Sequence, residues 1–176
     1  MDEHGFSAAI LKAAREKLGT VTPLKRDCGS LCGAACCKTD EDGRGGMLLF
    51  PGEEEFYRAL PDGFSLAEDS SLVPGAKLFT CLGLCARDVR PLACRVFPLM
   101  FIRKGTEYSV KLDPRAWPLC PLMPSGLEGL SVDFVSAAQE AASILAQDET
   151  QRAFIFAQQR AVARLTQAPW EGGGEA

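Results

Sequence analysis

Cysteine is the residue type with the most chemical meaning in this sequence, because eight of its 176 residues are cysteines. A hydrophobic core does not need thiols at that density, whereas metal and redox sites do. The first four form one run, and the other four begin 44 residues later (81 minus 37): Cys28, Cys32, Cys36 and Cys37, then Cys81, Cys85, Cys94 and Cys120. If all eight serve one site, the chain must fold back on itself, and the metal is also a cross-link.

The spacing within each group favours metal binding. Two thiolates separated by two to four residues reach one zinc ion from a single turn, and Cys28 with Cys32 has that spacing, as has Cys81 with Cys85. The side chains of neighbouring residues point in different directions, so the adjacent pair Cys36 and Cys37 favours a polynuclear centre or two close sites. We predict that all eight cysteines are metal ligands. Zinc and iron both suit thiolates, and iron can be held as an iron-sulfur cluster.

A framework of disulfides is the alternative for these cysteines, and their even number is its only support. The first 19 residues carry Lys12, Arg15 and Lys17 and lack the apolar segment of a signal peptide. We therefore expect a cytoplasmic protein, in which thiols stay reduced. No apolar run approaches the roughly 18 residues of a membrane span, so no membrane partner is expected.

Arginines beside the second cysteine group are predicted to support the metal. A tetracysteine zinc site carries a net charge of 2 − 4 = −2, which needs nearby donors or cations, and Arg90 and Arg95 are provisionally assigned this role. The alternative is a solvated or phosphate-binding face. The formal net charge of the chain is only −4, which gives no reason to expect a nucleic-acid partner. A protein partner and the oligomeric state cannot be identified from these residues.

The sequence contains no pattern of a known catalytic site. His4 is its only histidine, and there is no Ser/His/Asp order, phosphate loop or dinucleotide-binding glycine pattern. A hydrolytic, nucleotide-binding or NAD-dependent activity is therefore not predicted, and a role other than catalysis is favoured.

The expected helices and strands indicate a small α+β domain whose loops are organised by metal. The domain is expected to span residues 1–168, with its cysteine-rich core at 28–122. A flexible tail is expected to follow at 169–176. An amphipathic helix is expected over residues 6–18, followed by a cysteine-bearing loop over 21–46. Pro51 and Gly52 precede a short helix over 53–60, whose three leading glutamates are interpreted as solvated. Residues 64–76 are expected to be irregular.

A short β-hairpin and two amphipathic helices are predicted for the second half of the chain. The expected strands are residues 97–103 and 107–112, joined by a turn that contains Gly105. Ser131 is expected to cap the first helix, and Asp148 with Gln151 resembles a capping box at the start of the second. These helices flank the predicted core.

One segment resembles a known family. The cysteine run followed by Arg90-Pro91-Leu92-Ala93-Cys94-Arg95-Val96-Phe97-Pro98-Leu99 is similar to the YkgJ-type cysteine-cluster proteins, which are described as zinc- or iron-chelating. In that family, a run ending in Cys-Cys precedes a segment of the form Arg-Pro-x-x-Cys-Arg-x-Phe-Pro. The resemblance covers about residues 28–122, and it implies a ligand set but no reaction. This chain has three residues in both gaps of its first run, where the family commonly has two.

Pro91 and Pro98 are expected to stiffen the part of this segment that lies between them. Pro91 biases Arg90 toward extended backbone, and Pro98 does the same to Phe97, which would orient Cys94. Phe97 and Leu99 would then pack beneath the site.

Three functions remain open on this basis. We favour a cytoplasmic metal-binding protein that chelates zinc or iron through its cysteines. An iron-sulfur protein that carries electrons, or a subunit of an oxidoreductase, is the second. A zinc-stabilised interaction module is the third.

Overall fold

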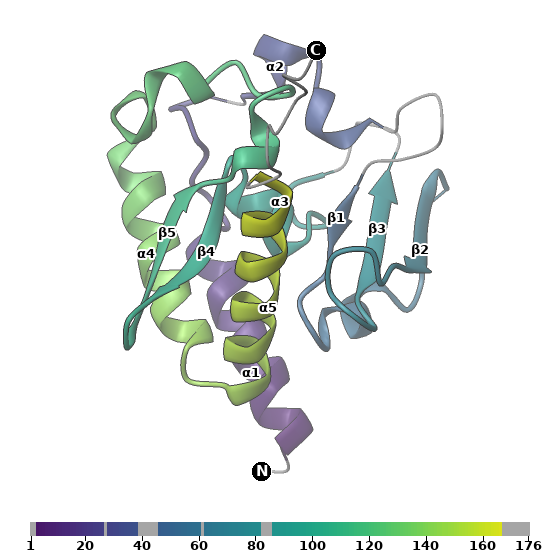
Figure 1. The fold of residues 1–176 in the computed structure, drawn as a ribbon. Helices are drawn as coiled ribbons and strands as arrows, with labels where there is room; N and C mark the ends of the chain where they lie inside the picture. The colour runs from purple at the N-terminus through teal and green to yellow at the C-terminus, as the bar shows by residue number, and fades with distance from the viewer. Residues whose placement is uncertain (1–2, 27, 39–45, 61, 82–85, 167–176) are drawn as a thin grey trace, which may run out of the picture.

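The computed structural model describes residues 3–26, 28–38, 46–60, 62–81 and 86–166, and the structural statements below concern these residues. Their fold is α+β, as predicted, with five α-helices and two antiparallel sheets (Figure 1). Cys85 and the predicted tail at 169–176 lie outside the described residues. None of the described helices has both the length and the apolar character needed to span a membrane.

The predicted hairpin is confirmed as the two-stranded sheet of β4 (Leu99–Lys104) and β5 (Glu107–Leu112). Its register pairs Leu99 with Leu112 and Lys104 with Glu107. Gly105 stands in the turn with a φ of 64°, a conformation that other residues adopt at a cost. Leu99, Met100 and Phe101 of β4 and Val110 of β5 are buried, whereas Arg103, Lys104 and Glu107 near the turn are exposed.

Three long helices cover this hairpin and build the main core. They are α1 (Glu3–Lys17), α4 (Val132–Leu145) and α5 (Glu149–Thr166), where α1 packs on α4, α4 on β5 and α5 on β4 (Figure 1). The predicted cap of α5 is confirmed, since the amide of Gln151 donates to Oδ1 of Asp148 at 2.9 Å. Ser131 occupies the N-cap position of α4, as predicted, but its side chain makes no capping hydrogen bond. The Ser131 amide instead donates to the carbonyl of Pro23 at 2.8 Å.

A second, three-stranded sheet corrects the prediction that residues 64–76 are irregular. Its strands are β1 (Met47–Leu48), β2 (Phe64–Glu68) and β3 (Lys77–Cys81), in the order β1-β3-β2. Phe64 pairs with Cys81 in this sheet, and Phe64 and Leu66 pack against a small buried cluster that contains Leu49, Tyr57, Phe79 and Cys81. Burial of these side chains on one face of β2 gives the segment a strand conformation.

Short helical turns make up the remaining segments. The helix expected over 53–60 is a 3-10 helix from Glu53 to Tyr57, and the cysteine-bearing loop contains α2 (Gly29–Cys32) and a 3-10 turn over Ala35–Cys37. A fifth α-helix, α3 (Leu92–Val96), lies inside the segment that was expected to be stiffened by its prolines.

Candidate metal centre

The cysteine run folds into two short turns that bring its thiols to one side of the molecule. Cys28 precedes α2 and Cys32 ends it, and Gly33 and Ala34 follow in the left-handed conformation with φ of 59° and 55°. This reversal is fixed by the Ala34 amide, which donates to the carbonyl of Gly29 at 3.0 Å. The chain then re-enters a helical turn that carries Cys36 and Cys37.

Cysteines from three parts of the chain line a first small cavity of about 50 Å³. Its cysteine side chains are Cys28, Cys36, Cys37 and Cys94. Cys94 comes from α3, 57 residues after Cys37 (94 minus 37), so the predicted fold-back of the chain brings the two groups together. A space of this size exceeds the volume that one water molecule needs.

A second small cavity of about 30 Å³ adjoins the first. It is lined by Cys28, Cys32, Cys36 and Cys120, so Cys28 and Cys36 belong to both cavities. Burial raises the pKa of the Cys120 thiol, and the nearby Cys32 thiolate acts in the same direction. Six of the eight predicted ligands are thus gathered around two neighbouring spaces.

The other two predicted ligands are Cys81 and Cys85. Cys81 is buried at the end of β3, and its Sγ lies 4.0 Å from the main-chain oxygen of Cys37, so it adjoins the first cavity without lining it. The predicted ligand Cys85 lies outside the described residues. Within the described part of the chain, no three His, Cys, Asp or Glu side chains stand close enough together to hold an ion in the positions they occupy.

The backbone around Cys94 is a short helix, a conformation that the expectation of a stretch stiffened by two prolines did not specify. Pro91 has extended backbone and begins α3, and Phe97, before Pro98, is extended at its end with ψ of 136°. The helix can start here because the amide of Leu92 donates to Oε1 of Glu53 at 2.7 Å. Each proline therefore bounds the turn that carries Cys94.

Phe97 packs against the cysteines, as predicted, and Leu99 does not. The Phe97 side chain lines both small cavities. Leu99 is 1% exposed and belongs to the main core, and neither of the two cysteine cavities includes it.

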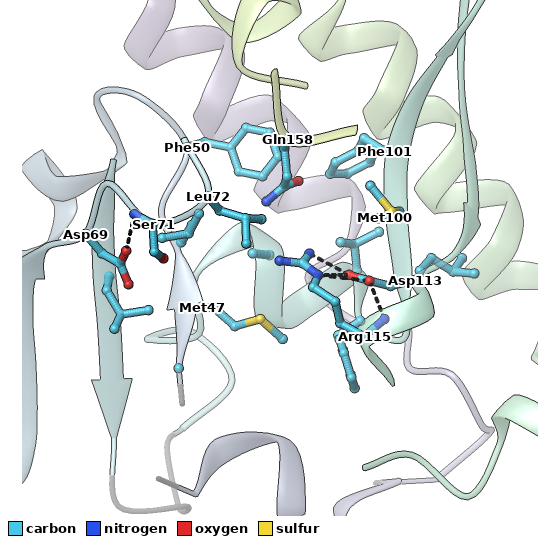
Figure 2. A pocket seen from close by; sticks show the side chains of 17 residues that line it. Met47, Phe50, Asp69, Ser71, Leu72, Met100, Phe101, Asp113, Arg115 and Gln158 are labelled. Carbon is cyan, nitrogen blue, oxygen red and sulfur yellow. Dashed lines mark hydrogen bonds and ion pairs between the residues drawn. The ribbon is translucent and has the colours of Figure 1, made fainter. Parts of the chain in front are cut away.

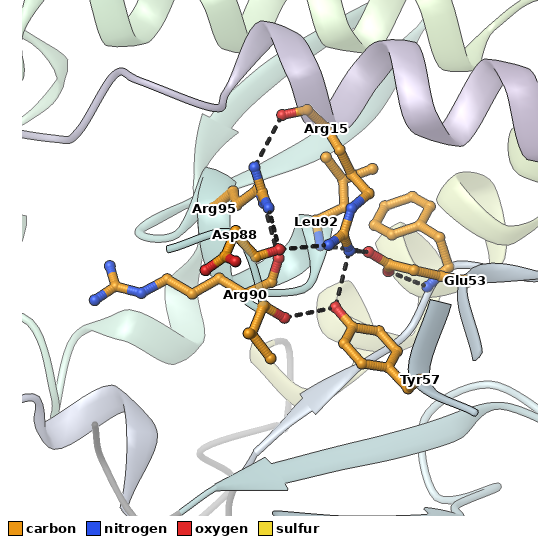
Figure 3. Close-up of polar contacts among 9 residues, drawn as sticks. Arg15, Glu53, Tyr57, Asp88, Arg90, Leu92 and Arg95 are labelled. Atoms are coloured by element: carbon orange, nitrogen blue, oxygen red, sulfur yellow. Dashed lines mark hydrogen bonds and ion pairs between the residues drawn. The ribbon is translucent and has the colours of Figure 1, made fainter. Parts of the chain in front are cut away.

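Arg90 and Arg95 both line the first cavity, together with Arg87. Arg95 is buried, and its guanidinium donates to the main-chain oxygens of Arg90 and Asp88, both at 2.8 Å, and of Arg15 at 3.2 Å (Figure 3). Burial lowers the pKa of Arg95, and the charge of Arg15 contributes to this shift. The predicted supporting arginines therefore place positive charge beside the thiols, and Arg95 also fixes the backbone of this region.

Glu53 is completely buried, which corrects its interpretation as a solvated residue at the start of a helix. Its carboxylate pairs with Arg15 and accepts hydrogen bonds from the amides of Leu92 at 2.7 Å and Phe50 at 3.2 Å (Figure 3). Burial raises the pKa of Glu53, while Arg15 and the two amides act against that shift. Of the three leading glutamates, only this one turns inward, since the side chains of consecutive helical residues point in different directions.

Arg15 and Tyr57 belong to the same cluster and were not predicted as site residues. Nη1 of Arg15 donates to the hydroxyl of Tyr57 at 2.8 Å, and that hydroxyl donates to the carbonyl of Val89 at 2.9 Å. A signal for Arg15 exists in the sequence, because it follows the buried Leu11 by four residues and precedes the buried Leu18 by three. A charged residue at that position must find a partner inside the protein.

No protein-family model, curated protein or solved structure matches this chain. The similarity to the YkgJ-type cysteine-cluster proteins therefore stays a prediction that rests on the quoted residues.

Proposed function

We propose that this protein binds zinc or iron through a dinuclear centre built from six cysteines. The proposal is supported by one observation above all. Two adjoining cavities are each lined by four cysteines, and Cys28 and Cys36 are common to both. Two four-coordinate ions that share two thiolates need six thiolates in all.

The ligand sets follow from the linings of the two cavities. One ion would be held by Cys28, Cys36, Cys37 and Cys94, and the other by Cys28, Cys32, Cys36 and Cys120. Small rotations of the thiols would have to bring each set together. The six are partly exposed and lie on short turns or at the end of one, where side chains are less restrained than in the core. Bound metal would stabilise these turns and supply a soft Lewis acid.

The surrounding charge agrees with such a centre. Two divalent ions with six thiolates carry a net charge of 4 − 6 = −2, and an anionic group of this kind needs nearby cations. Arg90 and Arg95 line the first cavity and supply two positive charges there. These charges would offset the net negative charge of the metal centre.

Purification without oxygen, elemental analysis and an absorption spectrum test the proposal. We expect two zinc or iron ions per chain, in a protein of the cytoplasm that needs neither nucleic acid nor membrane. Iron with an equal amount of sulfide would identify an iron-sulfur protein instead. A chain that binds neither metal would contradict the proposal.

Serine variants test the pairing of the cysteines. Cys28→Ser and Cys36→Ser remove a shared ligand and are expected to lose both ions. Cys37→Ser, Cys94→Ser, Cys32→Ser and Cys120→Ser are expected to lose one ion each. Cys81→Ser decides whether the predicted ligand outside the two linings takes part, because unchanged metal content would exclude it.

A further inference from the structure

A much larger cavity, of about 460 Å³, lies next to the first cysteine cavity. Its walls come from β1, the segment after β2, the end of α3, β4, the turn after β5, and α5. Met47 and Phe97 line both this cavity and the first cysteine cavity. The volume is within the range of small-molecule sites, about 300–1,000 Å³, and large compared with a packing defect.

The apolar part of the wall combines aliphatic side chains with three phenylalanines and two methionines. Phe50 and Phe101 form an edge-to-face pair with ring centroids 5.6 Å apart, and both line the cavity with Phe97 (Figure 2). The two methionines of the lining are Met47 and Met100. Aromatic rings and methionine sulfur both make favourable contacts with a flat aromatic ring.

One buried polar side chain in this wall has no partner. Gln158 is 5% exposed, and its amide makes no hydrogen bond to any residue that the structure describes. Figure 2 shows this amide turned from α5 into the cavity. The amide atoms are not themselves fully buried, so they are open to a partner inside the cavity. The amide offers one donor group and one acceptor.

Charges around the cavity argue against an anionic occupant. Arg115 points into it but already binds Asp113, with Nη2 to Oδ2 at 2.6 Å, so these two charges cancel (Figure 2). Asp69, also in the lining, leaves a net charge of 1 − 2 = −1. Nη1 of Arg115 makes no hydrogen bond within the described part of the chain and remains a donor for a carbonyl group.

We propose that this cavity binds an uncharged, planar heteroaromatic compound with a lactam edge, whose N–H and C=O pair with the amide of Gln158. The aromatic and methionine walls would hold the faces of the ring, and Arg115 would donate to a second carbonyl. This site requires no metal in the cysteine cavities, so it stands or falls independently of the proposed metal centre.

The probe for this test is 7,8-dimethylalloxazine, a fluorescent, uncharged tricyclic compound with lactam edges. Binding is measured by fluorescence anisotropy and calorimetry on the intact chain. Its 1,3-dimethyl derivative keeps the carbonyl groups but lacks the N–H groups, and we expect it to bind about tenfold more weakly or worse. Sodium 2-naphthoate provides an anionic comparison.

The variant Gln158→Leu should bind the probe about tenfold more weakly or worse, and it should no longer distinguish the two alloxazines. Gln147→Leu makes the same change at an exposed residue outside the lining and should bind like the unmodified protein. Circular dichroism checks that both variants fold.

Three results would overturn the proposal. The first is no probe binding up to about 1 mM. The second is equal binding to the unmodified protein and to Gln158→Leu. The third is tighter binding of naphthoate than of the alloxazine, which would indicate an anion site.

Discussion

Arg15 and Arg95 lie on different helices and donate hydrogen bonds to the same atom, the main-chain oxygen of Asp88, at 3.2 and 2.8 Å. Arg95 also donates to the main-chain oxygen of Arg15 at 3.2 Å. The two cations therefore face each other across a polar backbone segment, and the carboxylate of Glu53 pairs with Arg15. This cluster holds α1, α3 and the 3-10 helix in register behind the cysteines.

Arg95→Lys is expected to lower the free energy of unfolding by at least about 2 kcal/mol. The guanidinium of Arg95 binds three main-chain oxygens, and a lysine ammonium cannot reach all of them at once. A hydrogen bond to a charged group contributes about 1.5–3 kcal/mol. Urea unfolding followed by circular dichroism measures the change.

Arg103→Lys is the control for this substitution, because Arg103 is exposed on β4 and its side chain makes one hydrogen bond among the described residues, to Gly105. Its effect should stay within about 0.5 kcal/mol. Equal effects of the two variants would show that the buried cluster does not depend on the shape of Arg95.

Glu53→Gln should destabilise the protein by about 1–3 kcal/mol at neutral pH, because its side-chain amide cannot accept from Leu92 and Phe50 together. One of these buried amides would face a second donor. Glu55→Gln, an exposed change two residues along, should cost less than about 0.5 kcal/mol. Chemical denaturation of both variants provides the comparison. If Glu53→Gln leaves the free energy of unfolding unchanged, the role assigned to this carboxylate is wrong.

The pH dependence of the same variant tests the raised pKa of Glu53. A folded-state pKa above the unfolded one means that the folded protein binds more protons, so this group's contribution to stability falls as pH rises between the two pKa values. The stability of the unmodified protein relative to Glu53→Gln should therefore decrease from below pH 4.5 toward neutrality. An increase over that window would mean that Arg15 outweighs the burial of the carboxylate.

Gly46→Ala is expected to disrupt the edge of the three-stranded sheet. Gly46 has a φ of 120°, and an added Cβ would stand 2.6 Å from the main-chain oxygen of Phe79. Gly105→Ala makes the same change at a φ of 64°, where nothing lies within 4 Å. We expect a cost of about 1–2 kcal/mol at Gly105 from the backbone alone. At Gly46 overpacking should add a further 1–3 kcal/mol or so, and thermal unfolding would rank the two variants.

Removal of metal should lower the stability of the purified protein. A ligand that binds only the folded chain stabilises it by about 2.7 kcal/mol when present at 100 times its dissociation constant. A chelator should therefore lower the melting temperature, and added zinc or iron should restore it. The Cys28→Ser variant should show no such response. A melting temperature that is unaffected by chelator would contradict a metal that organises the cysteine turns.

Part of this fold follows from the sequence because its signals are local. Two short segments joined by a turn that contains Gly105 predict β4 and β5, and Asp148 with Gln151 predicts the start of α5. The three-stranded sheet lacks such a signal, since β1 has only two residues and β2 exposes Ser65, Ala67 and Glu68. These strands form because Phe79 and its neighbours are buried, which depends on contacts distant in sequence.

The candidate site, like the fold, is predictable from the sequence only in part. The cysteines and the arginines beside Cys94 can be chosen from residue type and spacing. The pairing of Cys94 with the first run, the burial of Glu53 and the orientation of Gln158 depend on how distant elements pack. Gln158 does leave a trace, because it interrupts the buried stripe of Phe154, Ile155, Ala161 and Val162 on α5.

The hydrogen bonds from Arg87 and Arg95 to the carbonyls of α1 and the turn after it limit how small a working fragment can be. Arg87 donates to the carbonyls of Gly19 at 2.6 Å and Leu18 at 3.0 Å. A fragment of residues 28–122 contains all eight cysteines, yet it would lack the main-chain oxygens of Arg15, Leu18 and Gly19 that these arginines bind, and the core side chains of Leu11 and Leu18. We therefore expect a fragment that begins at Cys28 not to fold independently, and a folding unit that contains the cysteines to include the first helix.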